Sequence, residues 1–241
     1  MCDQSCIRLG QTYFTEDRVR GKSVIEVGSR NVNGSLRPII EALNPQSYIG
    51  VDLEEGLGVD EICDAGELVD RFGSEAFDLL ISTFLVEHVN DWRRVISNFK
   101  HVLKPNGILL VSTASKDFPY HGYPFDYWRY ELDDLQIIFS DFIVELLEED
   151  ISKHLVYIIA RKPPIFEEKD LSDYQLYSII RGARAPKIFT KDVMLFKIKH
   201  PSLGLRKIAA IVAQQLPVPV KHVIKRLLVI WGRTRLKYGH D

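Results

Sequence analysis

The sequence predicts an α/β fold with a doubly wound, mostly parallel sheet. Apolar runs of strand length alternate with helical patterns along the first two thirds of the chain, and this alternation is typical of a sheet that carries helices on both faces. With 46% hydrophobic and 27% charged residues, the 241-residue chain has the composition of a soluble protein with one main domain. No apolar run approaches the roughly 18 residues that span a bilayer, and no charged-then-apolar leader is recognised, so we expect neither export nor membrane integration.

The expected strands are short apolar runs, at residues 24–27, 48–51, 77–82, 107–113, 142–147 and 155–160, with a weaker one at 59–62. The expected helices lie between them, at residues 36–43, 66–72, 91–103 and 132–139. The sequence Lys104-Pro105-Asn106-Gly107 ends the third of these helices with a stop-and-turn signal. Only a short turn separates the last two strands, so we expect them to pair antiparallel, which makes the sheet mixed.

Pro163-Pro164 interrupts this pattern, and we place a boundary there between an α/β domain at residues 1–162 and a helical extension at residues 163–241. Residues 161–241 carry 17 basic and 6 acidic side chains, whereas residues 1–160 carry 14 and 27. Two functional regions are therefore expected.

Three cysteines occur, Cys2, Cys6 and Cys63. They are too few for a disulfide framework and lack the paired spacing of a structural zinc site. We therefore expect a reducing cytoplasm and no metal.

The first strand and the turn after it have the pattern of a nucleoside-binding crossover. The strand contains Glu26 and leads into Gly28-Ser29-Arg30, and the following strand ends on Asp52. A carboxylate at that strand end can bind a ribose diol. Such a turn also occurs for plain packing, and Asp52 could cap a helix, so the cofactor has to be identified from residues further along.

Further motifs follow in a fixed order: Cys63-Asp64-Ala65, the strand from Phe77 to Thr83, Glu87-His88-Val89 before Asp91-Trp92, and the stretch from Leu103 to Val111. Their order and spacing resemble the class I S-adenosylmethionine-dependent methyltransferases, in the broad type 11 group. The resemblance covers roughly residues 20–160. It implies a seven-stranded sheet with an antiparallel strand near one edge, and S-adenosylmethionine as the cofactor.

The resemblance also implies roles for individual residues. Asp52 would bind the ribose hydroxyls, Asp64 the adenine amino group, and Glu26 would border the methionine end of the cofactor. The cofactor-binding residues that it implies are Glu26, Gly28, Ser29, Arg30, Asp52, Leu53, Asp64, Ala65, Thr83 and Phe84. Arg30 stands where the usual spacing has a second glycine, and its side chain is expected either to turn outward or to contact the cofactor carboxylate.

His88 is a candidate catalytic base, because imidazole titrates near neutral pH and this residue follows a strand end that faces the site. In the alternative, Glu87-His88 only organises the loop before the helix that Asn90 or Asp91 caps.

The aromatic stretch at residues 118–130 follows the fifth strand and could form a substrate wall. We expect His121, Tyr123 and Asp126 to bind the substrate, with His121 as a second candidate base for a hydroxyl acceptor. The alternative is a packed lid in which Asp126 and Arg129 form a structural ion pair. Trp128 is assigned to packing.

Residues 219–238 have apolar side chains on one helix face and lysines and arginines on the rest. Such a helix could pack on the domain, pack on a second subunit to give a homodimer, or lie on an anionic membrane surface through residues 203–238. Nucleic acid is not expected as a partner, because the basic residues belong to no recognisable RNA-binding module.

Together these observations predict an S-adenosylmethionine-dependent methyltransferase of the cytoplasm, or of the inner face of the membrane. It is expected to methylate an oxygen of a small molecule or of a glycan or glycolipid precursor. The alternative is a non-catalytic S-adenosylmethionine-binding module that docks to a membrane or a partner through its basic C-terminal helix. A nicotinamide-dependent reductase is disfavoured, because no Tyr-x-x-x-Lys pair occurs.

Overall fold

The computed structural model of the protein describes residues 4–122 and 125–200. The chain divides into two compact units, Met1–Ile188 and Phe189–Asp241. Tyr123 and the basic segment 203–238 lie outside the described residues. No helix among the described residues has the length and apolar character that crossing a membrane requires.

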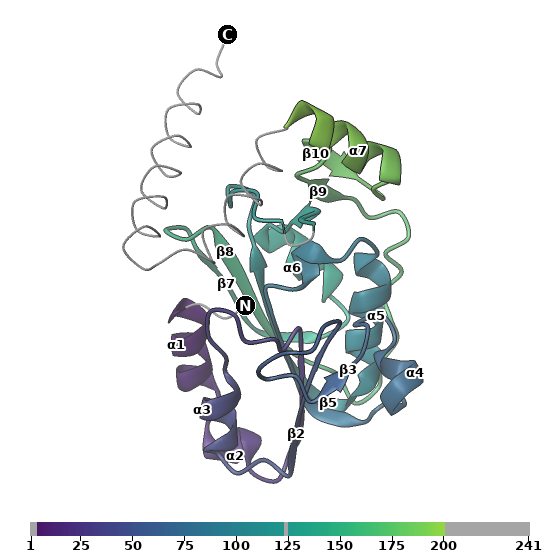
Figure 1. The fold of residues 1–241 in the computed structure, drawn as a ribbon. Helices are drawn as coiled ribbons and strands as arrows, with labels where there is room; N and C mark the ends of the chain where they lie inside the picture. Colours follow the sequence, from purple (N-terminus) through teal and green to yellow (C-terminus); the bar gives the residue numbers. More distant parts are fainter. Residues whose placement is uncertain (1–3, 123–124, 201–241) are drawn as a thin grey trace, which may run out of the picture. The chain divides into compact units, whose positions relative to one another are not determined.

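The first unit is built on a seven-stranded sheet with the strand order β3-β2-β1-β4-β5-β8-β7 (Figure 1). The strands are β1 (Ser23–Val27), β2 (Ser47–Asp52), β3 (Glu61–Ile62), β4 (Phe77–Thr83), β5 (Leu103–Ala114), β7 (Ile143–Asp150) and β8 (Leu155–Arg161). The first five are parallel to one another, and β8 pairs antiparallel with both β5 and β7. The predicted mixed, seven-stranded sheet is confirmed.

Helices cover both faces of this sheet. They are α1 (Gln4–Tyr13), α2 (Glu16–Val19), α3 (Arg37–Glu41), α4 (Leu68–Phe72), α5 (Trp92–Val102) and α6 (Leu132–Ile138), with a single 3-10 turn, η1 (Val86–His88). In Figure 1 the purple helices α1, α2 and α3 lie on one side of the strands, and α4, α5 and α6 lie on the other.

The central strands are apolar on both faces because helices bury both. Val24 of β1 and Leu79 of β4 join Cys6, Val19 and Ile40 in the core under α1, α2 and α3. The next residues along these strands, Ile25 and Leu80, are in register with each other and with Leu109 of β5, and all three are buried on the opposite face. Continuous rather than alternating apolar runs follow from this double burial.

Residues 163–188 belong to the first unit, so that unit extends past the boundary expected at Pro163-Pro164. A second sheet of order β10-β9-β6 explains why: β9 (Leu176–Ser178) pairs antiparallel with β6 (Trp128–Arg129) and with β10 (Ala183–Ala185). Strands of two or three residues are too short to show a period of two, so hydrophobic periodicity does not predict them.

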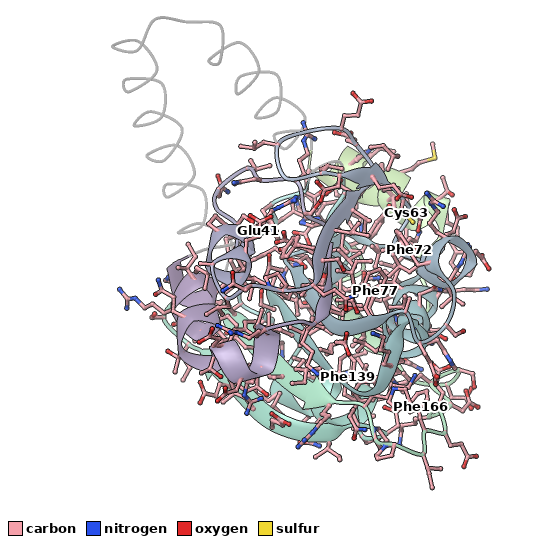
Figure 2. All side chains as sticks on the ribbon, turned by 90° about the horizontal axis from the view of Figure 1, so that it is seen from below. Glu41, Cys63, Phe72, Phe77, Phe139 and Phe166 are labelled. Atoms are coloured by element: carbon pink, nitrogen blue, oxygen red, sulfur yellow. The ribbon has the colours of Figure 1, made fainter. Side chains whose placement is uncertain are left out.

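Aromatic contacts also place this segment in the first unit. Phe166 packs edge-on against Phe142, with ring centroids 5.6 Å apart, and Phe142 in turn packs against Phe139 at the end of α6. Figure 2 labels Phe139 and Phe166 together with Phe72 and Phe77, which form a similar edge-on pair between α4 and β4. In the second unit the described residues, 189–200, form helix α7 (Thr190–Lys199) and its two flanking residues.

Candidate functional site

The strand order reverses between β1 and β4, and a ligand crevice is expected at the carboxyl ends of strands on either side of such a point. At the end of β1 the chain turns at Gly28, whose φ is 80°. This left-handed conformation favours glycine. The backbone N–H groups of Gly28 and Ser29 both donate to the carbonyl of Val51, at 2.9 and 3.0 Å, which holds the turn against β2.

Two of the predicted cofactor carboxylates lie close together at this edge. Asp52 ends β2, and its backbone carbonyl accepts from the N–H of Cys63 at 3.0 Å. Asp64 is the next residue after Cys63, so this hydrogen bond brings it near Asp52. The Asp52 carboxylate accepts from the backbone N–H of Arg30, at 3.2 Å, and of Glu54, at 3.3 Å. Asp64 accepts from the N–H of Gly66, at 2.7 Å, and remains exposed. Both carboxylates therefore keep acceptor capacity for a ligand.

Two side chains flank Asp52. Leu53 is 64% exposed, an apolar surface beside the carboxylate. Arg30 makes an ion pair with Glu54, so its side chain turns toward the loop after β2.

Glu26 lies inside the sheet and is 3% exposed. Its Oε2 accepts from the Tyr48 hydroxyl at 2.7 Å. Burial raises the pKa of Glu26 to about 7, and the hydrogen bond from Tyr48 opposes this rise only in part.

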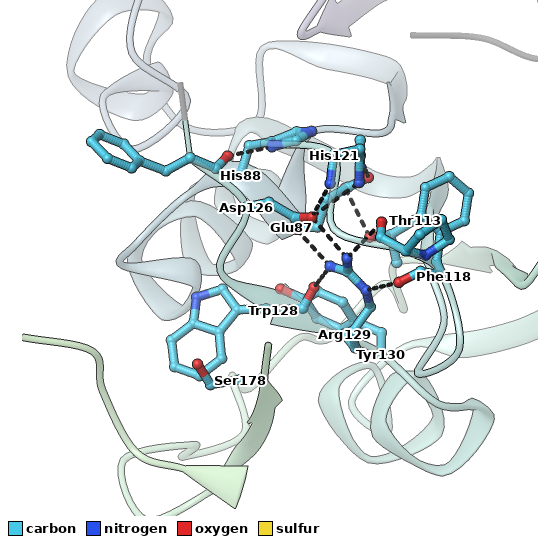
Figure 3. Close-up of polar contacts among 12 residues, drawn as sticks. Glu87, His88, Thr113, Phe118, His121, Asp126, Trp128, Arg129, Tyr130 and Ser178 are labelled. Atoms are coloured by element: carbon cyan, nitrogen blue, oxygen red, sulfur yellow. Dashed lines mark hydrogen bonds and ion pairs between the residues drawn. The ribbon is translucent and has the colours of Figure 1, made fainter. Parts of the chain in front are cut away.

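The carboxyl end of β4 leads into a second group of polar residues, drawn in Figure 3. Glu87 of η1 is fully buried, and its Oε2 accepts from the Thr113 hydroxyl of β5 at 2.9 Å. The neighbouring His88 ring places Nδ1 2.6 Å from the Phe125 carbonyl oxygen. Because a carbonyl only accepts, Nδ1 carries a hydrogen, and in the neutral ring Nε2 is then the nitrogen with the lone pair.

His121 enters this group from the loop after β5. Its Nδ1 lies 3.0 Å from Asp126 Oδ2 and its Nε2 lies 3.7 Å from Glu87 Oε1. Asp126 also holds the buried Arg129 guanidinium, which donates through Nη1 at 2.5 Å and Nη2 at 2.7 Å. Arg129 Nε donates to the carbonyl of Phe118, at 3.0 Å, so the pair fixes the aromatic loop.

The charges of this group shift its pKa values. Burial alone would lower the pKa of His121, but the contacts and charges of Asp126 and Glu87 outweigh it and raise that pKa to about 9. Burial would raise the pKa of Asp126, yet Arg129 and His121 hold it well below its usual range. Burial likewise opposes the lowering of the Glu87 pKa by His121 and His88.

Comparison with known proteins identifies the family. The family described as "Methyltransferase domain" matches residues 3–149, which is more than half of the chain. The chain belongs to this family. This membership confirms the resemblance drawn from the sequence and agrees with S-adenosylmethionine as the cofactor.

The relatives of this methyltransferase domain are distant. It is 30% identical over 120 residues to a "Ubiquinone biosynthesis O-methyltransferase" of Coxiella burnetii (strain Dugway 5J108-111), with 44% of this chain and 49% of that protein covered. The matched part spans about half of the length of such curated relatives, or less.

Solved structures share the fold of the methyltransferase domain. The 1,6-didemethyltoxoflavin-N1-methyltransferase of Burkholderia thailandensis, with bound 1,6-didemethyltoxoflavin and S-adenosylhomocysteine, matches with a TM-score of 0.54 at 17% identity, covering 67% of this chain and 80% of that one. An S-adenosylmethionine-dependent methyltransferase from Mesorhizobium loti matches with a TM-score of 0.50 at 18% identity, covering 64% and 96%.

In the methyltransferase domain the predicted residues form two neighbouring groups. Thr83 is buried and in register with Ser112 of β5, and Phe84 follows it with a φ of 53°. The Phe84 ring packs on Phe118, and Phe118 packs on His121 with centroids 4.8 Å apart. Aromatic contacts thus connect the predicted cofactor residues of β4 with the histidines. Tyr123 lies outside the described residues.

The structure adds residues to this site that the sequence did not assign to it. Glu87 was read only as a possible loop organiser, and Thr113 had no role. The ion pair between Asp126 and Arg129 was the alternative to substrate binding, and it is present. Both carboxylate oxygens of the fully buried Asp126 are engaged within the protein. Trp128 is buried, as its assignment to packing expects.

Proposed function

We propose that this chain transfers the methyl group of S-adenosylmethionine to an oxygen of a small-molecule acceptor. One observation carries the proposal. The carboxylates that would hold the nucleoside, Asp52 and Asp64, lie at the strand ends beside the switch point, and the histidine pair His88 and His121 lies at the neighbouring ends of β4 and β5.

The name of the curated relatives, ubiquinone biosynthesis O-methyltransferases, supports oxygen as the acceptor atom. A small aromatic acceptor would suit the rings of Phe84 and Phe118, since aromatic faces pack well on one another. We therefore favour a small aromatic alcohol over a glycan or glycolipid precursor.

Methyl transfer is a direct displacement. The acceptor oxygen forms a bond to the methyl carbon, the carbon–sulfur bond breaks, and sulfur keeps the electron pair as S-adenosylhomocysteine leaves. The enzyme helps mainly by aligning the oxygen behind the methyl group and excluding water. A hydroxyl acceptor must also lose its proton, and Nε2 of His88 is the candidate atom to receive it. Because the pKa of His121 is raised to about 9, His121 holds its own proton at neutral pH and would act as a base only after losing that proton.

Asp126 would act through His121. Its Oδ2 lies 2.9 Å from the His121 backbone nitrogen and 3.0 Å from the ring Nδ1, so it fixes both the backbone and the ring. We propose that Asp126 positions His121 and that His121 and Tyr123 contact the substrate.

The test begins with calorimetric titration of S-adenosylmethionine and S-adenosylhomocysteine, with a nicotinamide dinucleotide as the control ligand. Micromolar binding of the sulfur nucleosides alone is expected. Formation of S-adenosylhomocysteine is then measured with aromatic alcohols and with nucleotide sugars as acceptors. His88→Gln and His121→Gln should lower kcat by about 10²-fold or more while leaving the cofactor Kd unchanged. Binding without turnover on any acceptor would favour the non-catalytic binding module.

Location and assembly remain predictions. If residues 203–238 bind the membrane, their deletion should abolish binding to anionic vesicles. If they bind a second copy of the chain, their deletion should abolish the dimer.

A further inference from the structure

The feature that the proposed displacement leaves unexplained is the carboxylate of Glu87. The side chain is 0% exposed, and only Oε2 is satisfied, by the Thr113 hydroxyl. Oε1 makes no hydrogen bond and lies 3.7 Å from His121 Nε2. A buried carboxylate oxygen without a hydrogen bond costs free energy, and a cation bound between this oxygen and the histidines would remove that cost.

Both neighbouring histidines are held in the way that metal-binding histidines are held. The Nδ1 atom of His88 is held by the carbonyl of Phe125 at 2.6 Å, and that of His121 by the carboxylate of Asp126 at 3.0 Å. A carbonyl or carboxylate on one ring nitrogen fixes the ring and leaves the other nitrogen to ligate a cation. Arg129 fixes Asp126 in turn, through two hydrogen bonds.

The three side chains converge on one point. One ligand atom from each of Glu87, His88 and His121 lies within 4.8 Å of the other two. The rings of His88 and His121 pack edge-on with centroids 4.8 Å apart, and Figure 3 draws them next to Glu87. Metal–ligand bonds of about 2.0–2.2 Å require ligand atoms about 3–4 Å apart. Side-chain rotations that move the ligand atoms by about 1 Å would therefore bring all three within bonding distance of one ion.

We propose that Glu87, His88 and His121 bind one divalent first-row transition-metal ion, such as Zn²⁺, Mn²⁺, Fe²⁺ or Co²⁺. Two imidazoles and one carboxylate suit these ions, whereas Mg²⁺ and Ca²⁺ prefer oxygen ligands. Three protein ligands leave coordination positions open, as in catalytic rather than structural sites. The prediction of no metal from the cysteine pattern did not consider these residues.

The consequence for the reaction rests on the proposed function. The ion would lie beside Phe118, which contacts both His121 and the predicted cofactor residue Phe84. An acceptor hydroxyl at an open position would lose its proton to solvent more readily, because a divalent cation lowers the pKa of a bound hydroxyl. The two histidines would then bind the ion instead of acting as bases.

The experiment uses the 241-residue chain after treatment with a chelator to remove bound metal. Titration with Co²⁺ is followed by its visible absorption bands, which report direct nitrogen and oxygen ligation, and titration with Zn²⁺ is followed by calorimetry. We expect one ion per chain with a Kd in the micromolar range or below. His88→Gln and Glu87→Gln should each weaken binding at least tenfold and alter the cobalt spectrum; Glu87→Gln keeps an oxygen for Thr113.

The matched control is His101→Gln. His101 also lies beside a carboxylate, with Nε2 2.9 Å from Glu168 Oε2, but no third ligand among the described residues joins this half-buried pair. The variant should bind the metal as the wild type does. Each variant is checked for folding by circular dichroism and by its affinity for S-adenosylmethionine.

Three results would overturn the metal site. They are the absence of a cobalt spectrum in the wild type, binding that folded His88→Gln and Glu87→Gln retain in full, and equal loss of binding in His101→Gln. None of them affects the proposed methyl transfer, which fails separately if S-adenosylmethionine does not bind. A protein that binds S-adenosylmethionine but no metal would keep His88 as the candidate base.

Discussion

Asp126 contacts both the backbone and the side chain of His121: its Oδ2 lies 2.9 Å from the His121 backbone nitrogen and 3.0 Å from the ring Nδ1. The same carboxylate binds Arg129 through two hydrogen bonds, and both Asp126 and Arg129 are fully buried. The orientation of His121 therefore depends on a charge pair that the aromatic loop encloses.

Replacing Asp126 by asparagine should destabilise the protein by about 3–5 kcal/mol, because it leaves the Arg129 charge buried without a counter-charge. The free energy of unfolding, measured with urea, tests this. Glu67→Gln is the control, since Glu67 and Arg94 pair at 3.4 Å with both side chains more than half exposed; its effect should stay within about 0.5 kcal/mol. Similar losses for both variants would mean that Asp126 is not the fixed point of the loop.

The second prediction concerns the nucleoside. Asp52→Ala should weaken S-adenosylmethionine binding at least tenfold, about 1.4 kcal/mol, because the ribose hydroxyls lose their acceptor. Asp52→Asn keeps an oxygen for the N–H groups of Arg30 and Glu54, and so separates loss of charge from loss of the loop.

Asp78→Ala is the matched control for Asp52. Asp78 lies near the start of β4, at the opposite edge of the sheet from the predicted cofactor site. It accepts from the Ser23 N–H at 2.9 Å and from Lys104 at 2.8 Å. Its removal should lower stability and leave cofactor affinity unchanged. Calorimetry that finds equal affinities for wild type and Asp52→Ala would remove Asp52 from the site.

The sequence was sufficient to predict the main sheet, because strands such as β1 and β4 are buried on both faces and therefore read as unbroken apolar runs. It could not predict β9 or β10, whose pairing depends on contacts made after the chain has folded. The same holds for the site. Asp52 ends a recognisable strand, whereas the meeting of Glu87 with His121 depends on the loop that follows β5, for which sequence periodicity carries no signal.

A third prediction tests the close approach of the glycine turn to β2. A Cβ on Gly50 would lie 2.2 Å from the Gly58 carbonyl oxygen and 2.8 Å from Ser29 Oγ. Gly50→Ala should therefore push the loop away from the strand, costing about 1–3 kcal/mol and weakening S-adenosylmethionine binding.

Gly21→Ala serves as its comparison. Gly21 lies away from the site and has a φ of 69°, with nothing within 4 Å of an added Cβ. The alanine variant should therefore acquire backbone strain of about 1–2 kcal/mol without a clash. It should leave cofactor binding intact. Thermal denaturation and calorimetry measure both effects; unchanged affinity in Gly50→Ala would show that the loop tolerates the displacement.

The last prediction uses the pKa of Glu26. Burial raises this pKa from 4.5 to about 7, so between these values the folded state binds more protons than the unfolded state. Stability from this group is present at pH 4.5 and below, falls as the pH rises toward 7, and then levels off, a loss of at most about 3 kcal/mol. Glu26→Gln cannot titrate but still accepts the Tyr48 hydrogen bond. Its melting temperature relative to the wild type should therefore rise between pH 5 and pH 7.5; a constant difference across that range would mean that Glu26 titrates normally.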